Sequence, residues 1–123
     1  MTDREAEDRV EAKWRTLLAA PYVDTALVRA AHAEPRLRQL FPWSGHGELH
    51  FSRRIDDPWT WDIPFIRPQP GGRFRIEGPS RSEYVGEVHS VEAAVAAVAD
   101  RLPPGCGPAV LGPAGPGDGG TAG

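Results

Sequence analysis

The chain has 123 residues, and its 17 acidic residues outnumber its 14 Lys and Arg residues to give a formal net charge of −3. This length predicts one domain, and the acidic balance excludes a dedicated nucleic-acid binder, which needs a basic face to neutralise phosphates. A single cysteine, Cys106, excludes an intramolecular disulfide framework and a cysteine-based zinc site. No apolar run approaches the roughly 20 residues of a membrane span, and the polar N-terminus is unlike a secretory signal peptide. We therefore expect a small, soluble, cytoplasmic protein that binds neither nucleic acid nor membrane.

Apolar residues recur at helical spacing through the first forty residues, and capping residues and prolines divide this part of the chain into three helices. A capping box beginning at Thr2 opens the first helix, which Pro21 ends. Asp24 can cap a second helix over residues 25–33, because its carboxylate can accept from a backbone N–H of the first turn. A short third helix is expected over residues 35–41, since proline suits its first position. The apolar positions of the three helices are Val10, Trp14, Leu17, Leu18, Leu27, Ala30, Ala31, Leu37, Leu40 and Phe41.

Beyond Pro42 the hydrophobic period changes from helical to two, which is typical of strands with one buried face. Four strands are predicted, over residues 49–55, 59–65, 73–77 and 83–89. Glycine, proline and aspartate separate them in short turns, so consecutive strands should pair antiparallel as a meander. The polar residues that alternate with the buried ones would then form an open face of the sheet.

A last helix and a Gly/Pro-rich tail complete the prediction. Ser90 can cap a helix that continues to Leu102 with a clean apolar stripe, and two prolines end it. The helices can cover the apolar face of the sheet, which predicts an α+β two-layer sandwich with N-terminal helices, a four-stranded antiparallel meander sheet and a C-terminal helix. We expect a single domain over residues 1–111. Residues 112–123 should form a disordered tail, because their composition cannot bury enough apolar surface.

The most suggestive group for metal chemistry is His46, Glu48 and His50, which would share one face of a strand. Two imidazoles and a carboxylate can bind zinc or another transition metal. The alternative is the polar face of an amphipathic strand, with His46 at a turn between two glycines. No further metal-ligand spacing supports the site, so we expect no metal and no cofactor.

Cys106 lies between two glycines that would let a substrate approach closely, and a thiol near a histidine can act as a nucleophile. The catalytic candidates are therefore His46, His50 and Cys106. The alternative for Cys106 is a small hydrophobic side chain packed in a turn.

Aromatic and charged residues gather in the middle of the sequence and are either packing elements or a binding surface. The aromatic residues can fill the layer between sheet and helices or line a pocket. The basic residues can form an anion-binding patch or pair with the neighbouring carboxylates. The residues that we expect to contribute to binding are Trp43, His50, Arg54, Asp62, Arg73 and Arg75.

Several segments resemble an actinobacterial family of unknown function described as "natural product biosynthesis protein". The resemblance is carried by residues 41–53, 61–64, 72–75, 90–102 and 103–110, which occur in the same order. It implies a small cytoplasmic protein that is encoded near enzymes of secondary metabolism, and it implies no catalytic residues.

Two function classes remain. The first is an accessory protein that binds another protein, a carrier or a peptide of a biosynthetic pathway, and a homodimer also remains open. The second is a small tailoring enzyme that uses His46 or His50 with Cys106 or a nearby carboxylate. A toxin-neutralising immunity protein fits the size and acidity, but no motif supports it.

Overall fold

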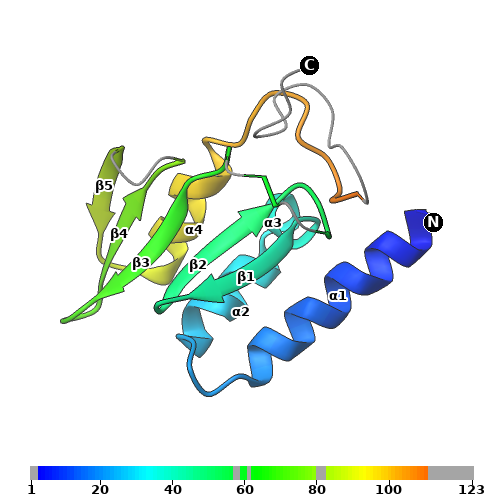
Figure 1. Cartoon of the computed structure of the whole chain (residues 1–123). Coiled ribbons are helices and arrows are strands. Elements are labelled where there is room, and N and C mark those ends of the chain that lie inside the picture. The colour runs from blue at the N-terminus through cyan, green and yellow to red at the C-terminus, as the bar shows by residue number, and fades with distance from the viewer. Residues whose placement is uncertain (1–2, 57–58, 61, 80–82, 111–123) are drawn as a thin grey trace.

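The structure is a computed structural model that describes residues 3–56, 59–60, 62–79 and 83–110 (Figure 1). Helices and strands form one α+β arrangement, with three helices before a sheet and one after it. In chain order the elements are α1 (Asp3–Ala19), α2 (Thr25–Ala33), α3 (Pro35–Arg38), β1 (Phe41–Gly45), β2 (Glu48–Ser52), β3 (Phe65–Gln69), β4 (Arg73–Glu77), β5 (Tyr84–Val88) and α4 (Val91–Ala99).

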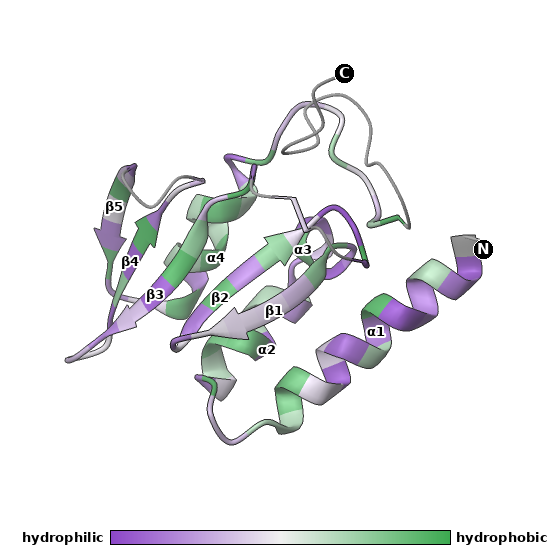
Figure 2. Cartoon of the chain, in the orientation of Figure 1, coloured by the Kyte–Doolittle hydropathy of each residue, from purple (hydrophilic) through white to green (hydrophobic). Residues whose placement is uncertain are grey.

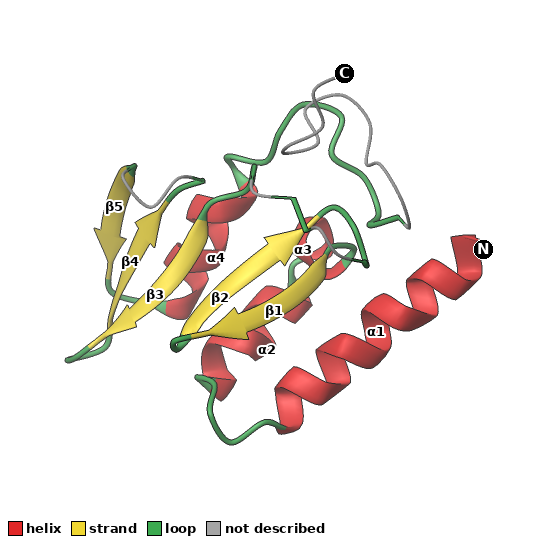
Figure 3. Ribbon diagram, in the orientation of Figure 1, coloured by secondary structure: helices red, strands yellow, loops and turns green. Residues whose placement is uncertain are grey.

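The strands form a five-stranded antiparallel sheet in the order β1-β2-β3-β4-β5. The predicted antiparallel meander and the helices on either side of it in sequence are confirmed, but the predicted number of four strands is wrong. The helices lie on one face of the sheet, where α4 packs against β3 and β4, and α1 packs against β1 (Figure 3). No helix among the described residues is long and apolar enough to cross a membrane.

Local capping sets the start of two helices where the sequence predicts them. The Asp24 carboxylate accepts from the backbone N–H of Leu27 at 3.1 Å, and the Ser90 hydroxyl accepts from that of Ala93 at 3.0 Å. Each bond satisfies a backbone donor that has no partner within its helix. Thr2, the expected cap of the first helix, lies outside the described residues.

The predicted third helix is too long, because it ends at Arg38 and the chain then enters β1. Pro42 does not stop a helix here but sits in an edge strand, a position that tolerates the missing N–H. His46 and Gly47 form the turn between β1 and β2, and both have positive φ values, 54° and 79°. A two-residue hairpin turn of the primed type requires this backbone, which explains a strand pair that the hydrophobic pattern alone did not reveal.

Two other strand predictions are also displaced. Of the strand expected over residues 59–65, the described residues 59–60 and 62–64 are not in a strand. The strand β3 begins only at Phe65, and Pro68 lies within it opposite Phe74. The strand expected over residues 49–55 is β2, and all five of its residues are buried, not only those on one face. Its second face is buried because other side chains cover it. Trp61 and the expected tail, residues 112–123, lie outside the described residues.

The core fills the layer between the sheet and the helices. Trp14 of α1 is fully buried in it, and its indole N–H donates to the carbonyl of Arg38 at 2.9 Å. Hydrophobic residues alternate with hydrophilic ones along β4, whereas α4 is mostly hydrophobic (Figure 2). The main sheet and helix residues in this core are Trp14, Leu17, Leu27, Leu49, Phe51, Ile66, Phe74, Ile76, Ala94 and Val98.

Candidate binding face of the sheet

The face of the sheet opposite the helices, which we term the outer face, carries most of the polar residues of the strands. Leu49 pairs with Ile66, and both belong to the core, so their neighbours in sequence point the other way. Cross-strand pairing then extends the outer face from β1 to β5. Its residues are Trp43, Glu48, His50, Phe65, Arg67, Arg73, Arg75, Glu77, Tyr84 and Glu87.

Four rings are stacked over the first strands of the outer face. The imidazole of His50 lies between Trp43, with ring centroids 4.0 Å apart, and Phe65, at 4.5 Å. Trp59, from the segment between β2 and β3, stacks on the other face of Trp43 at 4.9 Å. His50 is only 4% exposed and Phe65 only 1%. These rings explain why both faces of β2 are buried.

A buried carboxylate, that of Glu48, contacts the ring stack through His50. One oxygen of Glu48 is 2.9 Å from Nε2 of His50, and the other accepts from Nε of Arg67 at 3.0 Å. The Glu48 side chain is 3% exposed. A carboxylate in such a place is costly unless it is paired and hydrogen-bonded, and Arg67 supplies the opposite charge. We call Trp43, Glu48, His50, Trp59 and Phe65 the sealed half of the outer face.

Ion pairs continue from the sealed half toward β5. Arg67 also contacts Glu77, with Nη2 3.3 Å from Oε2, and Nε of Arg75 lies 3.5 Å from the second oxygen of Glu77. The guanidinium of Arg75 in turn lies over the ring of Tyr84, 4.7 Å from its centroid. The basic residues of this network contact neighbouring carboxylates, which is one of the two arrangements that the sequence allows, and the network joins a buried end to an exposed one.

Four residues of β4 and β5 are exposed on the outer face, whereas Glu77 on β4 is buried. Tyr84 is 58% exposed, and the side chain of Arg75 is 44% exposed. Nη1 of Arg73 lies 3.4 Å from Oε1 of Glu87, across the two strands. We call Arg73, Arg75, Tyr84 and Glu87 the exposed strip.

The predicted binding residues do not form one surface. Trp43 and His50 belong to the sealed half, and Arg73 and Arg75 belong to the exposed strip. The other two lie at the opposite end of β2: Arg54 pairs with Asp56 at 3.1 Å, and Asp62 accepts from Nε of Arg53 at 2.8 Å. A bridge between Arg54 and Val110 joins the segment that holds Arg54 to the end of the described chain.

The three catalytic candidates are also dispersed. His46 is exposed in the turn after β1, whereas His50 is enclosed in the ring stack. Cys106 is half-buried, and its electrostatic neighbours are Arg53 and Asp62, not a histidine. Burial raises the pKa of the Cys106 thiol, and Asp62 adds to this, so little nucleophilic thiolate forms at neutral pH. Of the candidate metal group His46, Glu48 and His50, only Glu48 and His50 touch, and the described part of the chain holds no cluster of three residues able to bind a metal ion.

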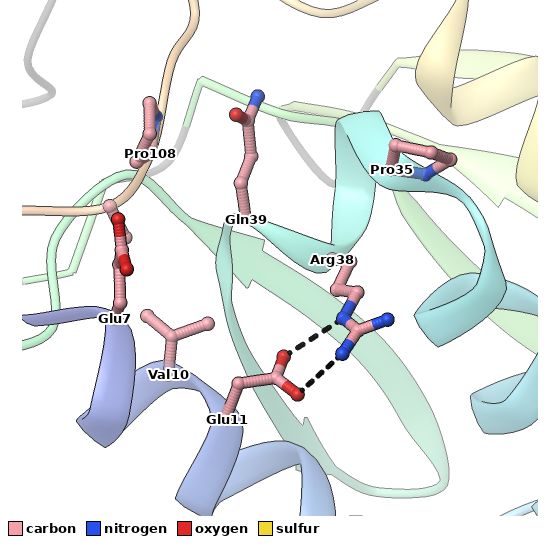
Figure 4. A pocket seen from close by; sticks show the side chains of 8 residues that line it. Glu7, Val10, Glu11, Pro35, Arg38, Gln39 and Pro108 are labelled. Atoms are coloured by element: carbon pink, nitrogen blue, oxygen red, sulfur yellow. Dashed lines mark hydrogen bonds and ion pairs between the residues drawn. The ribbon is translucent and has the colours of Figure 1, made fainter. Parts of the chain in front are cut away.

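The sequence pattern did not single out Tyr84, Glu87 or Arg67 as functional residues. Their alternation with apolar neighbours was the available signal, but it does not show which polar residues another segment covers. A second feature was not anticipated either: a pocket between α1, α3 and residues 108–109, at the far end of the molecule from β5 (Figure 4).

Comparison with known proteins gives a family but no activity. The model of a family of unknown function, DUF6193, matches residues 8–113 of the chain. No curated protein and no solved structure matches the chain.

Proposed function

We propose a function for this chain, which belongs to the DUF6193 family: it binds another protein, through the exposed strip, and does not itself turn over a substrate. The observation that carries the proposal is the exposure of Tyr84 beside Arg75, next to a sheet edge. Tyrosine and arginine are the residue types that most often dominate binding energy at protein interfaces, together with tryptophan. The ring and the guanidinium already contact each other, so little ordering entropy would be lost on binding.

The edge of the sheet specifies what kind of partner fits. Among the described residues, β5 pairs only with β4, whereas α1 packs against β1 at the opposite edge. An extended segment of a partner can add to such an edge through backbone hydrogen bonds. The favoured partner is thus a protein with an extended, mixed-charge segment.

The motif resemblance points to the pathway in which the partner acts. We assign the partner to natural product biosynthesis in an actinobacterial cytoplasm because of the motif resemblance of residues 41–53, 61–64 and 72–75. A carrier protein or a pathway peptide would both offer a segment of the required kind. A second copy of the chain, with β5 paired to β5, is the competing occupant.

A small tailoring enzyme remains the second candidate function, and one contact favours it. His50 and Glu48 form a histidine–carboxylate pair of the kind that transfers protons in enzymes, with a separation of 2.9 Å. Their side chains are only 5% and 3% exposed, and aromatic rings cover both faces of the imidazole. A substrate would have to displace the ring stack to reach them, which is why we favour the binding role.

The test compares two exposed tyrosines. Tagged protein in the native producer would be cross-linked, its partner identified and purified, and the dissociation constant measured by calorimetry for Tyr84→Ala, Arg75→Ala and the control Tyr22→Ala. Tyr22 is 62% exposed but follows α1, away from the sheet edge. We expect affinity to fall at least about tenfold for the first two variants, which corresponds to about 1.4 kcal/mol, and to stay within about twofold for Tyr22→Ala.

Product formation separates the two functions. If Tyr84→Ala binds the partner normally while a folded His50→Ala, His46→Ala or Cys106→Ala variant abolishes the product, the binding role is wrong and the enzyme takes its place. The oligomeric state tests the competing occupant. If the wild-type chain forms a dimer and Tyr84→Ala does not, a second copy occupies the edge, and the assignment to a different protein is wrong.

A further inference from the structure

A pocket of about 290 Å³ opens between α1, α3 and the segment that follows the last helix (Figure 4). Its wall is largely apolar, formed by Val10, Pro35 and Pro108. A smaller cavity of about 180 Å³ shares Glu7, Pro108 and Ala109 with it. Because a water molecule occupies about 30 Å³ of liquid, the larger pocket corresponds to about ten waters, or a ligand of about ten non-hydrogen atoms.

Long-range contacts hold the walls of the pocket in place. Arg38 donates to both oxygens of Glu11, with distances of 3.1 and 3.0 Å, and so ties α3 to α1. The backbone N–H of Ala109 donates to the carbonyl of Gln39 at 2.9 Å, which ties the end of the described chain to the same place. The pocket is therefore built before any ligand arrives, which lowers the cost of binding.

The charges that line the pocket do not cancel. The hydrogen bond from Arg38 holds the pKa of Glu11 below its usual value, so Glu11 is ionised but neutralised by Arg38. Glu7, one helical turn before Glu11, is an exposed residue that lines the pocket, and it has no hydrogen bond or ion pair with any residue that the structure describes. The side-chain amide of Gln39 likewise has no partner within the described ranges. The mouth of the pocket thus combines an uncompensated carboxylate, an amide and an apolar wall.

We propose that this pocket binds a small organic cation, an amine with an apolar body of about ten non-hydrogen atoms or fewer. The ammonium group would lie against the Glu7 carboxylate, whose negative charge has no other ion-pair partner among the described residues. The apolar body would lie on Val10, Pro35 and Pro108. The side-chain carbonyl oxygen of Gln39 would accept a hydrogen bond from a second N–H of the amine. This ligand class follows from the charge and volume of the pocket, and it is independent of the partner that binds the exposed strip.

Benzylamine is a suitable probe, with benzyl alcohol and benzoate as matched neutral and anionic ligands. Titration of each into isotopically labelled protein would be followed by amide chemical shifts. Benzylamine should shift the resonances of Val10, Gln39 and Ala109, and we expect its dissociation constant to be about fivefold lower than that of benzyl alcohol, which is the effect of one partly exposed ion pair. Benzoate should not bind.

Two charge-removing variants on the same helix test the role of Glu7. Glu7→Gln should raise the dissociation constant for benzylamine to that of benzyl alcohol, whereas Asp8→Asn should leave it unchanged. Asp8 is exposed on α1 and does not line the pocket. Equal affinity for the amine and the alcohol in the wild-type protein would overturn the proposal. An equal loss of affinity in both variants would also overturn the proposal, because the amine would then respond to the overall charge of the helix and not to Glu7.

Discussion

The sealed half and the exposed strip contain similar types of residue but have different surroundings. Both consist of polar or aromatic residues that alternate with core residues, and both lie on the same sheet. In the sealed half, the segment before β3 brings Trp59 onto Trp43 and encloses His50 and Glu48. In the exposed strip no described segment covers Tyr84 or Arg75, which remain 58% and 44% exposed. The alternation of polar and apolar residues thus predicts which face of the sheet a residue lies on, but not whether that face is exposed to solvent.

This difference changes what the same residue types contribute. A buried carboxylate such as Glu48 depends on its partners, because its ionised form has lost hydration. An exposed one such as Glu87 is still hydrated, so its ion pair with Arg73 contributes little to stability. We therefore expect the sealed half to serve stability and the exposed strip to serve recognition.

The largest contrast should come from removing one ring in each half. Phe65→Ala removes a side chain that is 1% exposed and stacked on His50, and it should lower the free energy of unfolding by about 3–5 kcal/mol. Tyr84→Ala should change it by less than about 0.5 kcal/mol. Urea denaturation measures both values. Equal losses would mean that Tyr84 is a packing residue and that the exposed strip is not a binding surface.

A smaller contrast is expected between the two carboxylates. Glu48→Gln keeps the shape of the side chain but removes the charge that Arg67 pairs with, and it places an NH2 group where a carboxylate oxygen faced a nitrogen of His50 or Arg67. The free energy of unfolding should fall by about 1.5–3 kcal/mol. Glu87→Gln is the control and should stay within about 0.5 kcal/mol. A neutral result for Glu48→Gln would show that the buried charge is dispensable.

The smallest contrast should come from two glycines. Gly78 has a φ of 103°, and a methyl group there would come within 3.1 Å of the Phe65 ring, so Gly78→Ala should cost about 1–3 kcal/mol. Gly86→Ala on β5 meets open space and should leave stability unchanged or slightly higher. Thermal unfolding of the two variants would show the difference. If Gly86→Ala were the more harmful, the space over the face of β5 at Gly86 would be filled in solution.

Part of the candidate site could be predicted from local spacing. Glu48 and His50 lie two residues apart, and a strand necessarily brings them to one face, where they touch. His46 belonged to the same predicted group but left it, because the backbone turns there with positive φ. The ring stack could not be predicted, since it requires the segment before β3 to fold back over β1. The alternation of residues 59–65 indicated a strand instead.

The sequence by itself determined the helices that Asp24 and Ser90 cap, the antiparallel order of strands and the core stripe of α4, because caps, short turns and periodicity act between near neighbours in the chain. Only the tertiary structure decided that β2 is buried on both faces and that a pocket forms where Ala109 meets Gln39. The physical reason is that burial depends on which distant segments supply the cover. That choice is made by packing over the whole molecule and leaves no local pattern in the sequence.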